Sequence, residues 1–256
     1  MRTDPTMTKM TTFRRRAWLS EMIAPAEYRC LNCGREVFDG LGFCNECKKT
    51  VVYNNGKTCK RCGMSIEGAE DYCGNCAFER TYFDRAYSAF CYEGAVRDVI
   101  LRFKFGGLGN FARVFAKYLA FLVKEAGVEF DVVTYAPMTK KSMKKRGYNQ
   151  AQLLAKYFCD ILECGEKLVD AIVKTKETEP QEQLGKAERK TNLVYAYDCV
   201  SDVKGKRVLV IDDVKTTGAT LNECGRVLKK AGATCVIGIT IASAREKLDY
   251  EVDDEG

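Results

Sequence analysis

A segment near the carboxyl end of the chain, VLVIDDVKTTGATL at 208–221, has residue types whose order could bind a phosphorylated sugar. Its four leading apolar residues predict a strand inside a sheet, and Asp212 and Asp213 follow where that strand ends. The small-residue loop 216–220 then leads into a predicted helix, whose N-terminal N–H groups and dipole attract phosphate, and Gly218 permits close approach of the backbone. Paired acids beside a phosphate make sense if they hold sugar hydroxyls or a hydrated Mg²⁺. A plain helix cap after a buried strand is the alternative, and it leaves the paired acids unexplained.

Two other segments offer groups for the same kind of ligand. A basic run without an acid follows a predicted strand end at 140–146, and its lysines form either a solvated loop or a phosphate-contacting surface. Arg146 differs from them because a guanidinium can bind phosphate through two parallel hydrogen bonds. The polar stretch 174–192 is long for a compact domain, as is typical of a lid.

The elements that must position these groups alternate along the chain. Periodicity predicts helices at 94–105, 111–126, 148–163 and 220–231, and strands at 86–92, 131–136, 168–173, 194–200, 207–211 and 235–242. This alternation indicates an α/β fold with a parallel sheet and flanking helices on both faces. Ligands of such sheets bind at the carboxyl ends of the strands, where the two acids are expected.

Cysteine spacing predicts a metal-binding module before this domain. Of the 14 cysteines, eight form four CxxC pairs, and the first two pairs recur as the last two at an offset of 29 residues: Cys30, Cys33, Cys44 and Cys47, then Cys59, Cys62, Cys73 and Cys76. Gly34 and Gly63 correspond in the same way, so the module is an internal duplication. Because the chain contains no histidine, each site would have four thiolates and would be a closed, structural zinc site.

Spacing leaves the grouping of the cysteine pairs open. Sequential pairing gives each copy its own zinc ion, whereas crossed pairing joins the first pairs of both copies and the last pairs of both copies. The duplication favours sequential pairing, since each copy is then self-sufficient. Disulfides, free thiols or an iron–sulfur cluster are the alternatives to zinc. Metal binding would supply much of the folding free energy of so short a module.

The segment at 208–221 resembles the phosphoribosyltransferase signature of four apolar residues, two acids and a T-T-G-x-T loop. Over nearly its whole length the chain also resembles the ComF family of competence proteins. The segments YEGAVRDVILRFKFGG (92–107), KKRGYNQAQLLA (144–155) and EPQEQLGKAERKTNL (179–193) occur with the four CxxC pairs and the terminal loop in that family's order. The resemblance implies a type I-like phosphoribosyltransferase fold and a link to uptake and processing of single-stranded DNA, beside a competence helicase.

The resemblance also assigns site residues. It implies that Asp212 and Asp213 contact ribose hydroxyls and that Arg146 acts with them in catalysis. The residues implied to bind phosphate or phosphoribosyl pyrophosphate are Lys215, Thr216, Thr217, Gly218, Ala219, Thr220, Pro137, Met138, Asn149 and Gln150. Those implied in the mobile loop are Lys174, Lys176, Gln181, Arg189 and Asn192.

Composition and charge frame these segments. We expect a tail with a short helix at 1–23, a double four-cysteine zinc-ribbon module at 24–80, a phosphoribosyltransferase-like domain at 81–245 and an acidic tail at 246–256. The arginines of the first tail form either a solvated arm or a contact to phosphate or a membrane surface. The net charge of +6 is compatible with phosphorylated ligands. We expect a cytoplasmic protein, because no apolar run reaches the length of a membrane span and no signal peptide is evident.

Three functions fit these observations. One is an enzyme that transfers the phosphoribosyl group, or hydrolyses its donor, with Mg²⁺. The second is a DNA-processing accessory that binds single-stranded DNA through its zinc ribbons and basic run. The third is a structural zinc adaptor with a degenerate transferase fold, against which the intact acid pair argues. Nucleobase salvage is a further alternative, although no pocket for a base is evident in the sequence.

Overall fold

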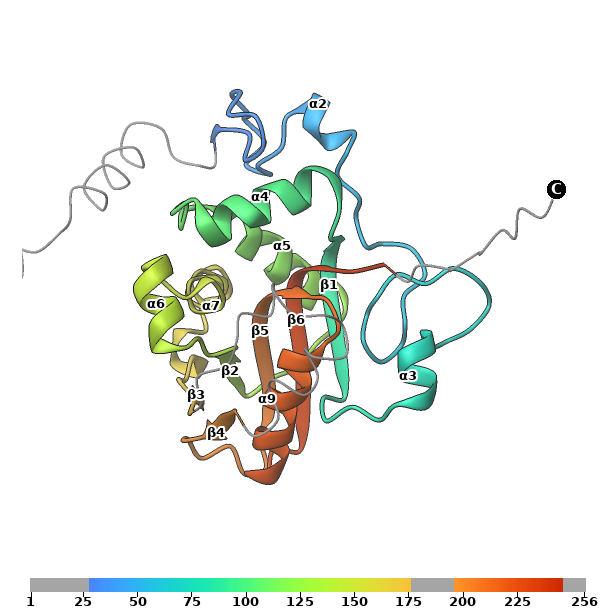
Figure 1. The fold of residues 1–256 in the computed structure, drawn as a ribbon, viewed down its shortest axis with the longest axis vertical. Coiled ribbons are helices and arrows are strands. Elements are labelled where there is room, and N and C mark those ends of the chain that lie inside the picture. Colours follow the sequence, from blue (N-terminus) through green and yellow to red (C-terminus); the bar gives the residue numbers. More distant parts are fainter. Residues whose placement is uncertain (1–27, 176–195, 246–256) are drawn as a thin grey trace, which may run out of the picture.

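The computed structural model describes residues 28–175 and 196–245 (Figure 1). The short N-terminal helix, the mobile-loop residues Lys176, Gln181, Arg189 and Asn192, and the acidic tail all fall outside these described residues.

A four-stranded parallel sheet forms the centre of the domain, in the order β1-β6-β5-β2. The strands are β1 (Arg85–Cys91), β2 (Val132–Tyr135), β5 (Arg207–Lys215) and β6 (Cys235–Ser243). The apolar run of β5 pairs with β2 on one side and β6 on the other, so its side chains are buried on both faces. The structure confirms the predicted α/β fold with a parallel sheet.

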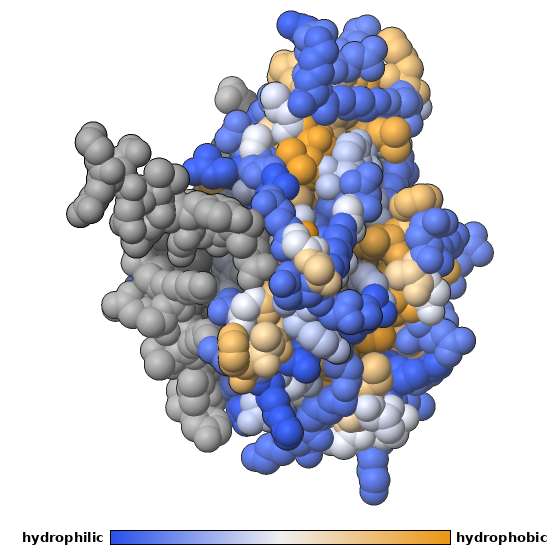
Figure 2. Space-filling model, turned by 90° about the vertical axis from the view of Figure 1, so that its right-hand side faces the viewer, coloured by the Kyte–Doolittle hydropathy of each residue, from blue (hydrophilic) through white to orange (hydrophobic). Residues whose placement is uncertain are grey.

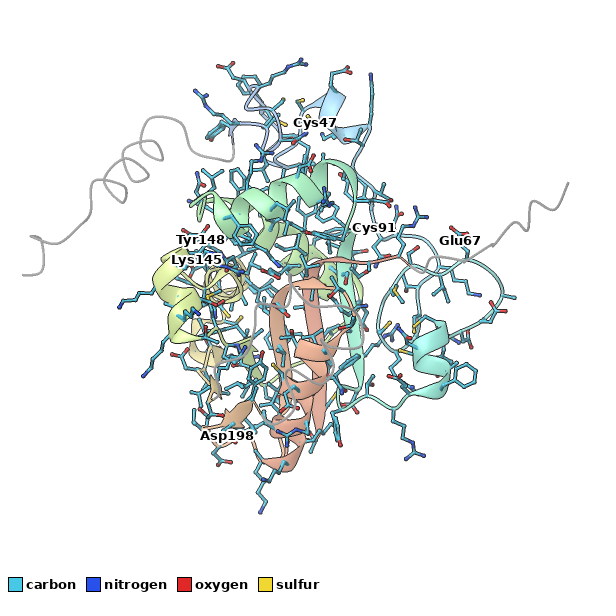
Figure 3. All side chains as sticks on the ribbon, in the orientation of Figure 1. Cys47, Glu67, Cys91, Lys145, Tyr148 and Asp198 are labelled. Carbon is cyan, nitrogen blue, oxygen red and sulfur yellow. The ribbon has the colours of Figure 1, made fainter. Side chains whose placement is uncertain are left out.

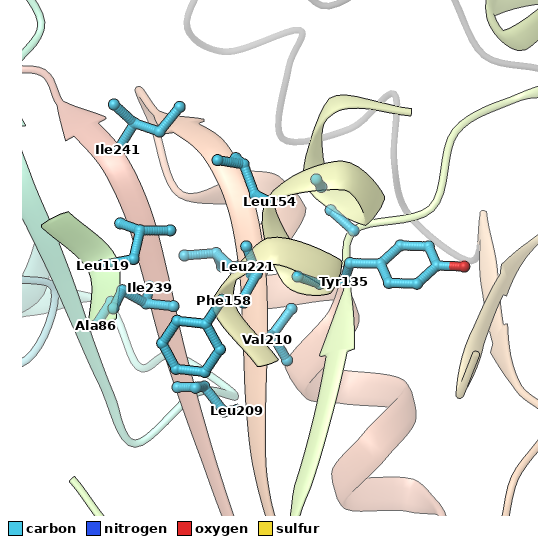
Figure 4. Packing of buried hydrophobic residues seen from close by; sticks show 14 of the residues in the cluster. Ala86, Leu119, Tyr135, Leu154, Phe158, Leu209, Val210, Leu221, Ile239 and Ile241 are labelled. Carbon is cyan, nitrogen blue, oxygen red and sulfur yellow. The ribbon is translucent and has the colours of Figure 1, made fainter. Parts of the chain in front are cut away.

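Helices cover both faces of this sheet. In Figure 1, α9 (Ala219–Lys230) lies in front of the sheet, while α5 (Phe111–Glu125) and α7 (Gln150–Leu162) lie behind it. Figure 4 shows Leu119 of α5 and Leu154 and Phe158 of α7 close to strand residues that include Leu209 and Ile239. α4 (Gly94–Phe105) lies across the carboxyl ends of the strands, and the short η3 (Gly165–Lys167) follows α7.

Two predicted strands do not join the main sheet. β3 (Ile172–Lys174) and β4 (Tyr197–Cys199) pair with each other in antiparallel fashion, on either side of the segment 176–195. Leu168, expected at the start of a strand, makes only an isolated parallel bridge with Val133. Each strand has one buried, one exposed and one half-buried residue, which suits a small sheet at the border of the domain rather than its centre.

The basic run is helical, which corrects its description as a loop. α6 (Lys140–Arg146) begins where Thr139 Oγ1 accepts a hydrogen bond from Ser142 N at 3.0 Å, and it ends at Gly147 with φ +83°. Because Asn149 caps α7, the helix predicted from residue 148 begins at Gln150. β5 also extends to Lys215, so Asp212 and Asp213 belong to the end of the strand.

The cysteine module consists of two ribbons of the same design. The first contains the bridge Arg29↔Glu36 and α2 (Asn45–Lys48); the second contains the bridge Thr58↔Ser65 and α3 (Gly74–Phe78). Sulfur atoms of Cys30, Cys33, Cys44 and Cys47 lie within 4.8 Å of one another, and so do those of Cys59, Cys62, Cys73 and Cys76. The cysteines therefore pair sequentially, as the duplication predicted.

The two ribbons contact different parts of the domain. In the first, Asn32 Oδ1 accepts a hydrogen bond from the Arg102 guanidinium of α4 at 2.9 Å, and Leu41 O accepts one from Tyr118 of α5 at 2.7 Å. In the second, Arg61 O accepts a hydrogen bond from Ala86 N of β1 at 2.8 Å. Figure 3 shows the separation through Cys47 of the first ribbon and Glu67 of the second.

The face that carries the second ribbon is mainly polar. Figure 2 shows that hydrophilic residues cover most of it and that hydrophobic residues form separate patches. No helix within 28–175 or 196–245 is long and apolar enough to cross a membrane.

Candidate functional site

A cavity of about 420 Å³ opens at the carboxyl ends of β2 and β5, beneath α4. It brings together predicted site residues from four separate segments of the chain: Pro137, Met138, Arg146, Asn149, Gln150, Lys174, Asp212, Asp213, Thr216 and Thr220. The remaining predicted loop residues, Lys215, Thr217, Gly218 and Ala219, line a small hollow within the loop itself, together with a second cavity behind it.

The loop between β5 and α9 has the geometry expected of an anion site. Gly218 precedes the helix with φ +79°, a conformation that side chains disfavour. The nearest atoms to a Cβ at this position would be 3.9 Å away, so the backbone angle rather than crowding requires glycine. Thr217 Oγ1 accepts a hydrogen bond from Ala219 N at 3.3 Å. The loop therefore presents the start of α9 toward the cavity.

The two acids have different surroundings. Asp213 Oδ1 lies 3.0 Å from Lys104 Nζ, while Asp212 Oδ1 accepts a hydrogen bond from Asp213 N at 2.8 Å. Desolvation raises the pKa of Asp212 to about 7, and the negative charge of Asp213 acts in the same direction. Near neutral pH Asp212 is therefore partly protonated, and a bound cation would displace that proton.

The motif RGYNQ at 146–150 joins three elements around the cavity. Asn149 Nδ2 donates to Ala136 O at 3.0 Å and its Oδ1 accepts from Ala151 N at 2.9 Å, which fixes the turn after β2 against the start of α7. Tyr148 donates to Phe103 O at 2.5 Å, and Gln150 Nε2 lies 3.4 Å from the same oxygen. The motif thus ties α6 and α7 to the end of α4, a role that the sequence did not reveal.

Arg146 and Lys174 extend positive charge along two sides of the cavity. The Arg146 guanidinium lies 4.9 Å from the centre of the Phe105 ring, and the Lys174 ammonium lies 5.6 Å from that of Tyr197. Figure 3 shows Lys145 and Tyr148 close together beside α6 and α7. The rings of Phe105 and Tyr197 hold Arg146 and Lys174 at the border of the cavity.

α4 supplies residues that the sequence reasoning missed. Arg97, Leu101 and Lys104 line the cavity, and their spacing places them on one face of the helix. Their segment carried the family resemblance without an assigned role. The available indication was the pair of cations on the face opposite the buried Val96, Val99 and Phe103.

Both cysteine clusters offer only sulfur donors, a ligand set that suits zinc. Every cysteine of the second cluster is buried, whereas Cys33 of the first is exposed. Among the described residues, each cluster has four cysteine ligands, which fill the four positions of a tetrahedral zinc ion and leave none open for catalysis. The donor chemistry therefore fits two structural zinc ions.

Comparisons with known families agree with both parts of the chain. The phosphoribosyl transferase domain family matches residues 141–255, and the double zinc ribbon domain family matches residues 19–77. Competence protein F of Haemophilus influenzae is 28% identical over 214 residues, which cover 80% of this chain and 92% of that protein. DNA utilization protein YhgH of Escherichia coli is 27% identical over 201 residues, covering 76% and 87%. Competence protein ComFC of Bacillus subtilis is 26% identical over 211 residues, covering 77% and 82%.

Some solved structures align with about half of this chain. The purine phosphoribosyltransferase of Pyrococcus horikoshii aligns with a TM-score of 0.32 and 22% identity, over 50% of this chain and 70% of that one. An allosteric regulatory enzyme of purine biosynthesis aligns with a TM-score of 0.33 and 26% identity, over 50% of this chain and only 25% of that one.

The parallel sheet, the loop after its paired acids and the cysteine tetrads define a phosphoribosyltransferase-like protein with a double zinc ribbon. Over most of its length the chain is similar to competence proteins F and ComFC, which confirms the predicted resemblance to the ComF family.

Proposed function

We propose that the cavity binds phosphoribosyl pyrophosphate, or a nucleotide with the same ribose 5-phosphate, together with Mg²⁺. The observation that carries this proposal is that Asp212, Asp213 and Arg146 line one cavity with Thr216 and Thr220, beside the small hollow formed by the rest of the loop. The 5-phosphate would bind at the start of α9, and the ribose hydroxyls would bind the two carboxylates. The pyrophosphate would lie between residues 137–139 and Arg146.

The acids suit a magnesium site because they provide hard oxygen donors at the border of the cavity. When bound, Mg²⁺ would neutralise negative charge on the pyrophosphate as it leaves. Loss of pyrophosphate breaks its bond to C1 of the ribose and leaves an oxocarbenium-like centre. With no histidine in the chain, positioning and charge neutralisation would contribute most to this step. Water or another nucleophile would then form the new bond to C1 and release a proton.

Calorimetry with phosphoribosyl pyrophosphate and Mg²⁺ tests the binding step. Asp213→Asn should weaken binding, whereas Asp198→Asn should not, because Asp198 is an exposed acid of β4 outside the cavity lining. Absence of binding to the zinc-loaded wild-type chain would reject the proposal. Tight binding would in turn exclude a purely structural adaptor with a degenerate site.

Phosphorus NMR of the same mixture separates an enzyme from a binding protein. Release of pyrophosphate in water alone indicates hydrolysis, whereas release that requires a free nucleobase indicates salvage. Binding without release supports a non-catalytic role. These outcomes distinguish the three versions of the proposal.

We also propose that this site serves competence-linked uptake or processing of single-stranded DNA, in the cytoplasm and beside a competence helicase. The observation that favours DNA binding is α6, whose sequence KKSMKKR contains no acid. Its four lysines are exposed, and Arg146 at its end lines the cavity. The names of the relatives, which refer to competence and DNA utilization, also support a role in handling DNA. In this proposal, residues 24–80 form the zinc module and residues 81–245 form the transferase-like domain.

Fluorescence anisotropy with a labelled single-stranded oligonucleotide tests this second proposal. Lys144→Gln/Lys145→Gln should lower the slope of log affinity against log salt by roughly 1.4, because each lost phosphate contact contributes about 0.7. Lys204→Gln/Lys206→Gln is the matched control, since this exposed pair precedes β5 at the opposite end of the strand. Binding that does not depend on salt, or equal effects of both pairs, would reject a role for α6.

A further inference from the structure

A second cavity, of about 310 Å³, lies behind the phosphate loop and faces the second zinc ribbon. Cys62, Cys73 and Cys76 line one side of it, and Lys215 and the loop 216–219 line the other. The loop that would hold the 5-phosphate therefore has the donor cavity before it and a metal-binding cluster behind it.

Lys215 is the residue that connects the two sides. It is the last residue of β5, directly before the loop, and only 3% of its surface is exposed. Its backbone is fixed, because its carbonyl oxygen accepts a hydrogen bond from Ala244 N at 3.0 Å. Its side chain lines the same cavity as Cys62, Cys73 and Cys76, so its positive charge lies beside the second metal-binding cluster.

A buried ammonium needs a compensating charge. A zinc ion held by four thiolates has a formal charge of roughly −2 and can provide it. The zinc-loaded cluster and Lys215 would therefore stabilise each other across the second cavity. In the first ribbon, the corresponding role belongs to a neutral amide, since Asn32 Nδ2 lies 3.4 Å from the Cys47 sulfur.

Close backbone contacts make this connection rigid. A Cβ on Gly63 would lie 2.2 Å from Ala86 O, so the ribbon lies directly against β1. The segment after the ribbon is equally close to α9, because Asn222 Oδ1 accepts a hydrogen bond from Tyr82 N at 2.7 Å. A Cβ on Gly225 would lie 2.8 Å from Phe83 N. Displacement of the ribbon would therefore be transmitted to the start of α9.

We propose that Lys215 is a positioning residue that couples the second zinc site to the phosphate loop. Zinc bound by Cys59, Cys62, Cys73 and Cys76 holds residues 216–220 in their binding conformation. The first zinc site does not, because its ribbon contacts α4 and α5 instead. The functional meaning of this coupling rests on the proposed donor site, whereas the order of the loop can be measured without any donor.

Lys215→Met tests the coupling in the full-length, zinc-loaded chain. It should speed chelator-driven release of one of the two zinc ions by about tenfold or more, as loss of groups that support metal ligands commonly does. Amide hydrogen exchange of residues 216–222 should rise by about tenfold in the same protein. Lys215→Arg retains the charge and should restore both properties. Lys60→Met is the matched control, because exposed Lys60 belongs to the same ribbon and pairs with Asp71 at 2.7 Å.

Cysteine variants provide the independent comparison. Cys47 and Cys76 are equivalent in the duplication, and each supplies the last ligand of its own cluster. Cys76→Ser should increase exchange in 216–222, whereas Cys47→Ser should leave that segment near its wild-type rate. Equal effects of the two variants would overturn the proposal, as would wild-type zinc release and exchange in Lys215→Met.

A titration with phosphoribosyl pyrophosphate and Mg²⁺ keeps the two proposals apart. If the wild-type chain binds no donor but Lys215→Met still loosens the loop, the coupling stands and the donor site fails. If the wild-type chain binds donor and Lys215→Met leaves the loop unchanged, the coupling alone fails.

Discussion

Lys104 Nζ lies 3.0 Å from Asp213 Oδ1, and this ion pair joins the last turn of α4 to the end of β5 across the cavity. Each side chain is only 13% exposed, so solvent screens the pair little. Both side chains line the cavity. Beside the pair, burial raises the pKa of the Asp212 carboxyl to about 7.

Removing this cation should destabilise the fold. We expect Lys104→Met to lower the free energy of unfolding by about 1–3 kcal/mol, because Asp213 loses a charged hydrogen-bond partner. The double variant Lys104→Met/Asp213→Asn should recover part of the loss. Urea denaturation with zinc retained measures both effects. Lys124→Met, an exposed change in α5, is the control, and equal stability of Lys104→Met and Lys124→Met would contradict the expectation.

Donor binding should depend on pH through Asp212. Burial raises the pKa of this carboxyl to about 7, so its ionised form, which can hold a cation, predominates only above that value. Affinity for donor with Mg²⁺ should therefore fall below pH 7, by up to about tenfold per pH unit. Asp212→Asn retains the titration of the ligand itself, so calorimetry of both proteins from pH 6 to pH 8 isolates the contribution of Asp212. Parallel profiles would contradict this expectation.

The same raised pKa gives the stability of the donor-free protein the opposite pH dependence, because this protein is stabilised at low pH. The folded state binds the Asp212 proton more tightly than the unfolded state does. The stabilisation is therefore complete below the unfolded pKa, near 4, and is lost as the pH rises to about 7. The unfolding temperatures of wild type and Asp212→Asn should therefore be similar near pH 4 and differ increasingly as the pH approaches about 7.

Asn149 should show separate roles for its two side-chain atoms. Asn149→Ala removes both the cap of α7 and the hydrogen bond to Ala136 O, and should cost about 1–3 kcal/mol. Asn149→Asp retains the cap but places a carboxylate against that carbonyl oxygen. It should keep α7 protected while amide exchange in 136–143 increases. If residues 136–143 of Asn149→Asp exchange at the wild-type rate, the hydrogen bond to Ala136 O does not hold the turn.

The equivalent glycines of the two ribbons should respond differently to alanine. Gly34 has φ +77° and no atom within 4 Å of a Cβ, whereas a Cβ on Gly63, at φ +65°, would lie 2.2 Å from Ala86 O. Gly34→Ala should therefore cost only the strain of a left-handed residue, about 1–2 kcal/mol. Gly63→Ala should lose more stability and release zinc faster under a chelator. Equal behaviour of the two variants would show that the second ribbon moves away from β1 easily.

Local patterns predicted a large part of this structure. The apolar spacing of 94–105 gave the bounds of α4, and the repeated cysteines indicated the sequential pairing, because both depend on short-range geometry. Likewise, the acids and the loop after β5 lie at the strand end where their order placed them. Periodicity could not identify α6, because its residues have no buried face; only Thr139 and Gly147 marked its ends.

Contacts between distant segments could not be predicted. Lys104 and Asp213 meet through the packing of α4 over the sheet, and nothing near either residue indicates the other. The pairing of β3 with β4 also joins segments on either side of 176–195. The structural role of RGYNQ was hidden for the same reason, since Tyr148 and Gln150 contact the end of α4.

The position of the ribbon module along β1 has a consequence for solubility. β1 is the last strand of the main sheet, with β6 on one side only. On its other side Cys91 N donates to Val52 O at 2.9 Å, Asn54 N donates to Ala89 O at 3.0 Å, and Ala86 N donates to Arg61 O at 2.8 Å. An uncovered strand edge is a template for pairing with other chains. We therefore expect a chain deprived of zinc to aggregate through β1 before its sheet unfolds, so that metal supply would limit its yield as a monodisperse protein.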